Sequence, residues 1–164
     1  MRGTSSQVKT ATTPVLGKQQ HPKDMIRIME AHDLSYIATA CPSYPADLYD
    51  KVRKAKNLHG TRYIHITAPC PPGWVFATSD TVKMGRLGVE TGVLVLLEME
   101  QGAFRLTGKS RAIARRGKRI PVDHYIHAQR RFNGIDAEGI PAFQQWVDGR
   151  WNTYVQRDAS LSRT

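Results

Sequence analysis

The sequence has no long hydrophobic run and no leader-like start. Its longest uninterrupted apolar stretch is Val93 to Leu97, far short of the roughly 18 apolar residues that a membrane-spanning helix needs. Residues 1–20 are polar, and no apolar block precedes a small-residue cleavage site. We therefore expect no membrane partner and no secretory signal, and the cytoplasm is the expected compartment.

Cysteine is also scarce. Cys41 and Cys70 are the two cysteines of the 164 residues, too few for the disulfide framework of a small secreted domain. No CxxC accompanies either of them, and the six histidines form no HExxH or paired i, i+4 arrangement. Each cysteine is therefore expected to be a buried thiol or a single ligand, and the spacing alone defines no complete metal site.

Acidic residues are missing from two basic segments. The formal net charge is +10, and the excess lies in residues 1–23 and in residues 105–119, which contain basic but no acidic side chains. The second segment also lacks aromatic residues, whereas surfaces that bind single-stranded nucleic acid alternate charge with stacking rings. A solvated loop or a contact with an acidic protein surface is favoured over nucleic-acid binding, and we expect no nucleic-acid partner.

The length suits one hydrophobic core, and the apolar periodicity predicts an α/β fold with a parallel sheet flanked by helices. A helix is expected to start near His21, and a β-hairpin with a turn at Gln101-Gly102 is expected in the second half. The other predicted elements are strands at Ser35–Ala40 and Arg62–Thr67, helices at about 45–58, 80–91, 121–132 and 136–156, and irregular chain at 69–79.

Three parts of the chain are distinguished by composition. Residues 1–20 are expected to be an extended segment, and residues 21–100 are expected to form the α/β part. Residues 101–164 are expected to hold the end of the hairpin, the basic loop and a helical tail. The last helix should dock on the rest of the protein through one broad apolar face, formed by Phe143, Trp146, Val147, Trp151, Tyr154 and Val155.

The segment from Ala68 to Trp74 is the most specific local feature. It follows a predicted strand directly, and ligands of α/β proteins bind beyond the carboxyl ends of strands. Three prolines fix Cys70, which by spacing alone is either a space-filling buried thiol or a ligand or redox group. Cys41 has the corresponding place after the first strand, where a small core residue is favoured over a redox pair. His65, within a strand, is expected to be a hydrogen-bonded core imidazole and not a base.

Several segments, in this order and spacing, resemble the C-terminal half of the β subunit of pyruvate synthase and related 2-oxoacid:ferredoxin oxidoreductases. The similarity runs from about Thr12 onward. Its most specific segments are Asp33–Ala40 with Tyr44-Pro45, Tyr63–Trp74, Glu90-Thr91-Gly92, Pro121-Val122 with Tyr125, and Gln129–Phe132.

The resemblance implies the fold, the cofactors and one site residue. It implies the C-terminal part of a thiamine-diphosphate-binding fold, with Mg²⁺ and a four-iron, four-sulfur (4Fe-4S) cluster. Such a complex decarboxylates a 2-oxoacid oxidatively, transfers the acyl group to coenzyme A and passes electrons through the cluster to ferredoxin. Cys70 is implied as the fourth cysteine ligand of the cluster, both cofactor-binding and metal-binding. No role transfers to Cys41, and no catalytic residue is assigned.

The sequence departs from the family in lacking its N-terminal half, with the CxxC and the Gly-Asp-Gly of the Mg²⁺ site. Residues 1–7 look like a shortened remnant of the Asn-Thr-Gly-x-Gln segment, and no cofactor contact is assigned there. The expected partners are the missing half, other subunits of the oxidoreductase and ferredoxin. Pyruvate is the default substrate; an enzyme of the phenylglyoxylate type and a non-catalytic truncated interaction fragment are the alternatives.

Overall fold

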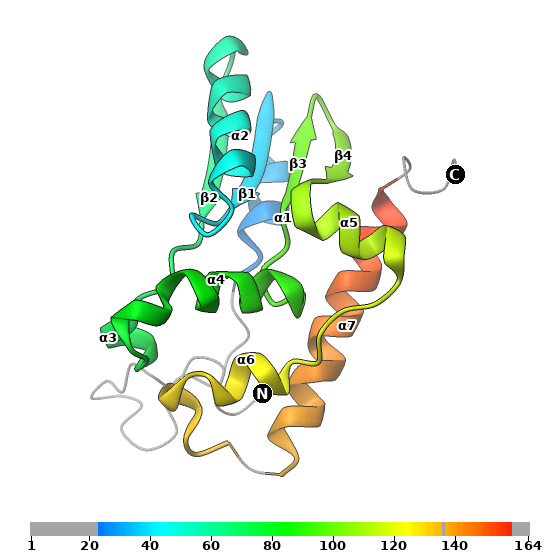
Figure 1. Ribbon diagram of the computed structural model, residues 1–164. Coiled ribbons are helices and arrows are strands. Elements are labelled where there is room, and N and C mark those ends of the chain that lie inside the picture. The colour runs from blue at the N-terminus through cyan, green and yellow to red at the C-terminus, as the bar shows by residue number, and fades with distance from the viewer. Residues whose placement is uncertain (1–22, 136, 159–164) are drawn as a thin grey trace, which may run out of the picture.

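A four-stranded mixed sheet is the centre of the computed structural model, which describes residues 23–135 and 137–158 (Figure 1). The strand order within these residues is β2-β1-β3-β4. The strands are β1 (Tyr36–Ala40), β2 (Arg62–Ile66), β3 (Leu97–Glu100) and β4 (Ala103–Leu106). The predicted parallel pairing of β1 with β2 is confirmed, while β3 joins β1 in the antiparallel sense. The predicted extended segment 1–20 lies outside the described residues.

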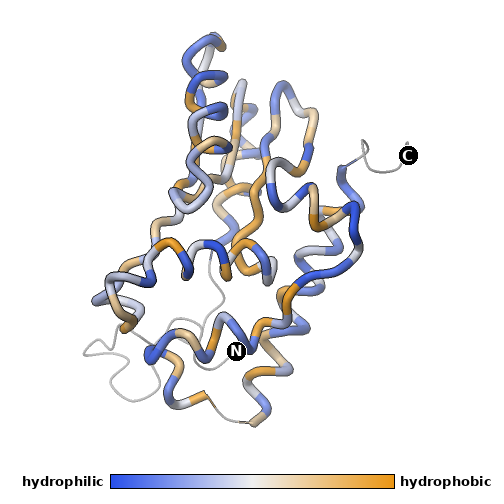
Figure 2. Tube along the Cα trace, in the orientation of Figure 1, coloured by the Kyte–Doolittle hydropathy of each residue, from blue (hydrophilic) through white to orange (hydrophobic). Residues whose placement is uncertain are grey.

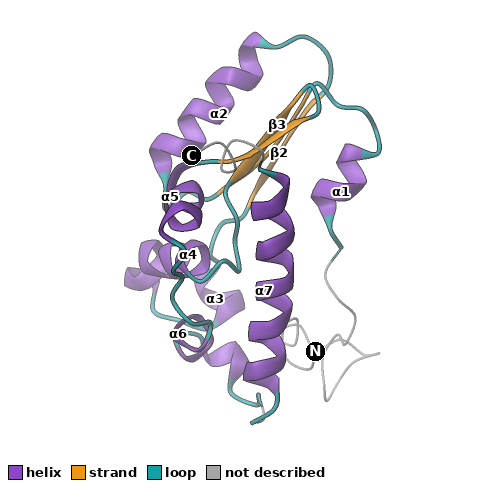
Figure 3. Ribbon diagram, turned by 90° about the vertical axis from the view of Figure 1, so that its right-hand side faces the viewer, coloured by secondary structure: helices purple, strands orange, loops and turns teal. Residues whose placement is uncertain are grey.

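Helices cover both faces of the sheet, as the α/β prediction requires. Figure 3 shows α2 on one side of the strands and α1 on the other. The helices are α1 (Met25–Glu30), α2 (Pro45–Asn57), α3 (Pro71–Trp74), α4 (Thr81–Glu90), α5 (Gly108–Arg116), α6 (Asp123–His127) and α7 (Gly139–Arg157), with 3-10 turns η1 (Thr78–Asp80) and η2 (Arg130–Phe132). None of these helices is long and apolar enough to cross a membrane.

Strand β1 is buried on both faces because its side chains alternate. Tyr36 and Ala38 pack against Ala55 of α2, and Ile37 belongs to the cluster that contains Ile26 of α1 and Trp151 of α7. The apolar stretch that leads into β3 runs through the centre of the molecule, where it is orange in Figure 2. The predicted docking face of α7 is confirmed by the burial of Phe143, Trp151 and Tyr154, and Trp146 is partly buried.

The predicted hairpin is confirmed, and its turn explains its sequence. Gln101 and Gly102 both have positive φ, 49° and 81°, and two-residue turns of this type match the right-handed twist of the strands. Glycine tolerates this backbone conformation without steric cost. The register places Glu98 opposite Arg105.

Two segments predicted as irregular contain helix. The basic segment 105–119 is not a loop, because α5 occupies most of it and buries Ser110 and Ile113. Gly108 stands at the first position of α5 with φ +45°. The segment 69–79 contains α3 and η1, because prolines at the first positions of α3 suit a helix start.

Glu98 is a buried carboxylate on the face that α2 covers. It is 5% exposed and accepts hydrogen bonds from Tyr36 Oη at 2.5 Å, Lys54 Nζ at 2.9 Å and Arg105 Nε at 2.5 Å. Burial alone would raise the pKa of this carboxyl, but the three donors together hold it below its ordinary value. The burial and the adjacent carboxylate raise the pKa of Tyr36.

We expect the Glu98 cluster to make stability depend on acid. Because the folded-state pKa is lowered, its contribution is complete above pH 4.5, the ordinary pKa, and is lost as the pH falls through the folded value. Glu98→Gln should lower the free energy of unfolding at pH 7 by about 2 kcal/mol and flatten the loss at low pH. Denaturant titrations followed by circular dichroism would measure both.

Asp50→Asn is the matched control for this experiment. Asp50 pairs with Arg53 at 3.0 Å, but both side chains are about two-thirds exposed, so the change should cost less than about 0.5 kcal/mol. Equal costs for the two variants would contradict the assignment of Glu98 as the stabilising carboxylate.

Candidate functional site

Cys70 lies beyond the carboxyl end of β2, as the sequence predicts, and it is exposed. Thr67 N donates to Ala40 O at 2.9 Å, which continues the pairing of β1 and β2 into the loop. Cys70 is the N-cap residue of α3, and its carbonyl accepts from Trp74 N at 2.8 Å. The alternative of a buried, space-filling thiol is therefore wrong for Cys70.

The side chain of Cys70 rests beside a glycine. A Cβ added at Gly73 would lie 3.1 Å from Cys70 Sγ, which is tighter than most real contacts. Pro71 and Pro72 occupy the first helical positions and fix φ there. The thiol therefore projects from a short, rigid turn that leaves room for sulfur and for little else on that side.

Residues of η2, in the second half of the chain, pack against this turn. Val75 has a left-handed backbone with φ 58°, and its carbonyl accepts from Arg130 N at 3.1 Å. The Arg131 guanidinium lies over the Trp74 ring, with Cζ 4.2 Å from its centroid, and donates to Tyr125 Oη at 2.9 Å. We call the contact of Arg131 with Trp74 and Tyr125 the Arg131 clamp.

The clamp is partly desolvated, which strengthens it. Trp74 meets the ring of Tyr125 edge-on, with centroids 6.2 Å apart. Burial raises the pKa of Tyr125 and lowers the pKa of the Arg131 guanidinium. The segment Gln129–Phe132, which carries part of the family resemblance, thus holds the Cys70 turn in place. No local sequence pattern predicts this contact, because its partners are far apart in the chain.

Cys41 has the structural place that the residue pattern favours. It is 1% exposed and packs with Val89 and Leu96. A Cβ added at Gly85 would lie 2.9 Å from Cys41 Sγ, so α4 approaches the thiol closely. Both cysteines are free thiols, and Cys41 is a core residue.

Among the described residues, Cys70 carries the one exposed thiol that could bind a metal. Among residues 23–135 and 137–158, no group of three or more His, Cys, Asp or Glu side chains is placed to hold a metal ion. His65 Nδ1 lies 3.1 Å from Tyr63 Oη, which confirms the expected hydrogen bond, but the side chain is half-buried and is not in the core. An iron–sulfur cluster takes four ligands, and the described residues could supply one of them through Cys70.

Curated relatives identify the proteins that this chain resembles. It is 43% identical over 143 residues to the pyruvate synthase subunit PorB of Methanothermobacter marburgensis, covering 85% of this chain and 48% of that subunit. It is 36% identical over 151 residues to PorB of Thermotoga maritima, covering 87% and 45%. No family model matches the chain.

A relative that is named for a different substrate also aligns with this chain. The ketoisovalerate oxidoreductase subunit VorB of Pyrococcus abyssi is 33% identical over 134 residues, which cover 82% of this chain and 42% of that subunit. The chain thus spans about half the length of the curated relatives it matches.

We expect the two cysteines to differ sharply in reactivity. Iodoacetamide should label exposed Cys70 quickly, and Cys41 at least about 100-fold more slowly, because its labelling needs local opening. Gly73→Ala should slow the fast reaction by crowding Sγ, and Gly149→Ala, which meets nothing within 4 Å, should not. Mass spectrometry of the labelled peptides would measure the rates, and equal rates at the two thiols would contradict the structure.

Proposed function

We propose that this chain, a homologue of about half of the PorB and VorB subunits, works as part of a 2-oxoacid:ferredoxin oxidoreductase of the pyruvate synthase type. Within that enzyme Cys70 supplies one thiolate ligand to an iron–sulfur cluster. The single observation that carries this assignment is the exposed thiol of Cys70 on a rigid turn beyond the end of β2.

The residues of this chain would hold and orient the cluster ligand. Pro71 and Pro72 restrict the turn, so little conformational entropy is lost when the Cys70 thiolate binds iron. The Arg131 clamp fixes the other end of the same turn. Thiamine diphosphate with Mg²⁺, when bound by the complete subunit, supplies the decarboxylation chemistry.

The proposed substrates are a 2-oxoacid and coenzyme A, with ferredoxin as electron acceptor. Pyruvate is the favoured 2-oxoacid because the PorB relatives are 36–43% identical, against 33% for VorB of Pyrococcus abyssi. The aligned region is common to relatives named for different 2-oxoacids, which suits a role in electron transfer more than a role in substrate choice.

The rest of the subunit is the proposed partner at the β2 side of the sheet. Strand β2 is one of the two edge strands of the described sheet, and Ile66 at its end is 49% exposed. Val75 and Val82, near the Cys70 turn in the chain, are 36% and 52% exposed. A bare strand edge with apolar residues beside it favours association, and the relatives are about twice as long as the aligned region.

Cys70→Ser in the assembled complex tests the proposed ligand. Because serine is a poor ligand for iron, we expect iron content and ferredoxin reduction to fall by about tenfold or more. Changing a residue that only orients a metal ligand already costs about this much. Cys41→Ala is the control, because Cys41 is buried away from solvent. Wild-type iron and electron transfer in Cys70→Ser would show that the assignment is wrong.

The basic segment is also proposed to contact protein. Three of its side chains are engaged within the fold: Arg105 pairs with Glu98, Lys109 with Glu90 and Arg119 with Asp148. Arg115, Arg116 and Lys118 remain exposed at the C-terminal end of α5. Figure 1 places α5 at the opposite end of α4 from α3. An acidic surface of a neighbouring subunit is therefore favoured over ferredoxin as its partner.

Changing Arg115, Arg116 and Lys118 together to Gln should weaken subunit assembly at low salt. The loss should be about tenfold in association rate, and it should shrink at high salt, where the charges are screened. Arg53→Gln, an exposed cation on α2, is the control. If assembly stays unchanged while binding to DNA or RNA is lost, the protein-contact proposal is wrong.

A further inference from the structure

Val75 has a backbone conformation that valine rarely adopts. It is the C-cap residue of α3, with φ 58° and ψ 64° in the left-handed region. Phe76 N donates to Pro71 O at 3.2 Å, which is the closing hydrogen bond of a Schellman motif. The left-handed position of that motif is usually glycine, because a branched side chain is strained there. The turn that starts at Cys70 therefore ends on a strained residue.

The side chain of Val75 does little to offset this strain. It is 36% exposed and belongs to none of the hydrophobic clusters that the described residues form. Asp33 and Gln101, the other non-glycine residues with positive φ in the described part of the chain, have no branched Cβ. Contacts other than the packing of its own isopropyl group must hold Val75 in this conformation.

Two adjacent residues of η2 make those contacts. Arg130 N donates to Val75 O at 3.1 Å, which fixes the peptide group that follows Val75. The Arg131 guanidinium lies against the ring of the preceding residue, with Cζ 4.2 Å from the centroid of Trp74 and 4.6 Å from that of Phe132. Phe132 is 4% exposed and lies within a hydrophobic cluster, so η2 is itself anchored.

The strained residue and the thiol lie at opposite ends of one closed turn. Trp74 N donates to Cys70 O at 2.8 Å, and Phe76 N donates to Pro71 O. If Val75 changed to the extended backbone that valine prefers, Phe76 N would move away from Pro71 O. The turn would then lose its closing hydrogen bond, and the thiol would no longer have one fixed orientation.

We infer that Val75 and Arg131 are coupled positioning residues. The contacts of η2 hold Val75 in its strained conformation, and the closed turn that results presents Cys70 in one orientation. The effect on a cluster ligand rests on the proposed function, whereas the coupling within the turn does not. The inference therefore predicts that relief of the strain compensates for loss of the Arg131 clamp.

Hydrogen exchange of the Trp74 and Phe76 amides in the full chain measures the opening of the turn. Relative to intrinsic exchange rates, Arg131→Met should speed exchange about tenfold, because a partly desolvated cation–π contact is lost. Val75→Asn should slow it about fivefold, because asparagine tolerates the left-handed region. Exchange in the double variant should return to within about threefold of wild type.

Val82→Asn is the matched control. Val82 is also an exposed valine, at 52%, but it lies in the right-handed helix α4. Its replacement should neither slow exchange in the turn nor compensate for Arg131→Met. Val75→Asn tests the strain without altering the clamp. Unchanged exchange in Val75→Asn or in Arg131→Met, or equal compensation by Val82→Asn, would overturn the inference.

Iron loss to a chelator from the assembled complex tests the consequence for the ligand. The rate should rise about tenfold in Arg131→Met, as when a residue that orients a metal ligand is changed. Adding Val75→Asn should restore it. Exchange rates that fail to change as expected would overturn the inference. The expected exchange rates, together with iron loss that is the same in all variants, would instead contradict the proposed role of Cys70.

Discussion

The central position of β1 is the constraint on which the rest of the structure depends. The strand is paired on both edges and buried on both faces, so its carboxyl end is fixed in space. The Thr39 hydroxyl donates to Val95 O and accepts from Leu97 N at 3.0 Å. This ties the apolar stretch before β3 to the same strand end. The loops that follow β1 and β2 therefore start from fixed points, which lets a short turn present Cys70 in one orientation.

A buried lysine connects this strand to the helices around it. Lys51 of α2 donates to Thr39 O at 2.8 Å and to the Asp47 carboxylate at 2.6 Å. Burial lowers the pKa of Lys51, and the neighbouring carboxylate opposes that effect. A Cβ at Gly108 would lie 2.9 Å from Asp47 Oδ1, so glycine lets the start of α5 approach this carboxylate. A negative charge at a helix start is favourable, and Asp47 therefore helps to explain why a basic segment is helical.

Local sequence patterns were sufficient to predict several of the helices and strands. The strands β1 and β2, the hairpin and α7 follow from periodicity and turn residues, and the structure confirms them. The helix α5 was missed because the basic segment 105–119 was interpreted as a loop. Its conformation depends instead on the approach to Asp47, which comes much earlier in the chain. Sequence periodicity carries no information about such a contact.

The candidate site, too, could be predicted only in part from the sequence. Its place after β2 followed from the order of strand and loop, and the prolines indicated a restrained turn. The exposure of Cys70 did not follow, because spacing alone fits a buried thiol equally well. The Arg131 clamp on Trp74 joins segments from the two halves of the chain. Only the packing of η2 against α3 brings them together, so the residue pattern could not reveal what holds the turn.

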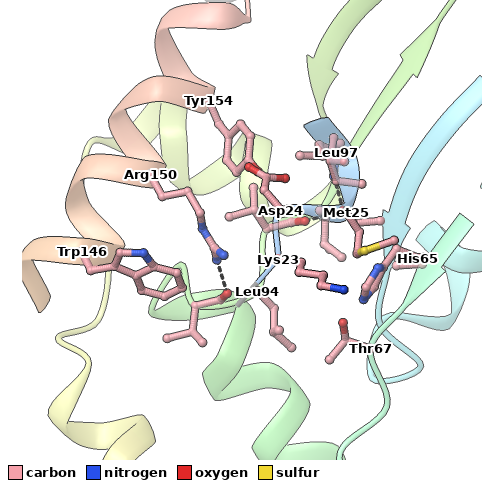
Figure 4. Close-up of a pocket in the computed structure, with 16 residues that line it drawn as sticks. Lys23, Asp24, Met25, His65, Thr67, Leu94, Leu97, Trp146, Arg150 and Tyr154 are labelled. Atoms are coloured by element: carbon pink, nitrogen blue, oxygen red, sulfur yellow. Dashed lines mark hydrogen bonds between the residues drawn. The ribbon is translucent and has the colours of Figure 1, made fainter. Parts of the chain in front are cut away.

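The positive charge of the chain has two physical consequences that its sum of +10 hides. The exposed cations at the C-terminal end of α5 are hydrated and lie at the negative end of the helix dipole, so they cost little and act mainly through long-range attraction. Arg150 is different, because its guanidinium is desolvated, donates to Val93 O and is attracted by the Asp24 carboxylate (Figure 4). A hydrated cation can remain unpaired, whereas a desolvated one favours a counter-ion at short range. The location of each charge, and not their sum, therefore separates a surface that attracts partners from a cation held within the fold.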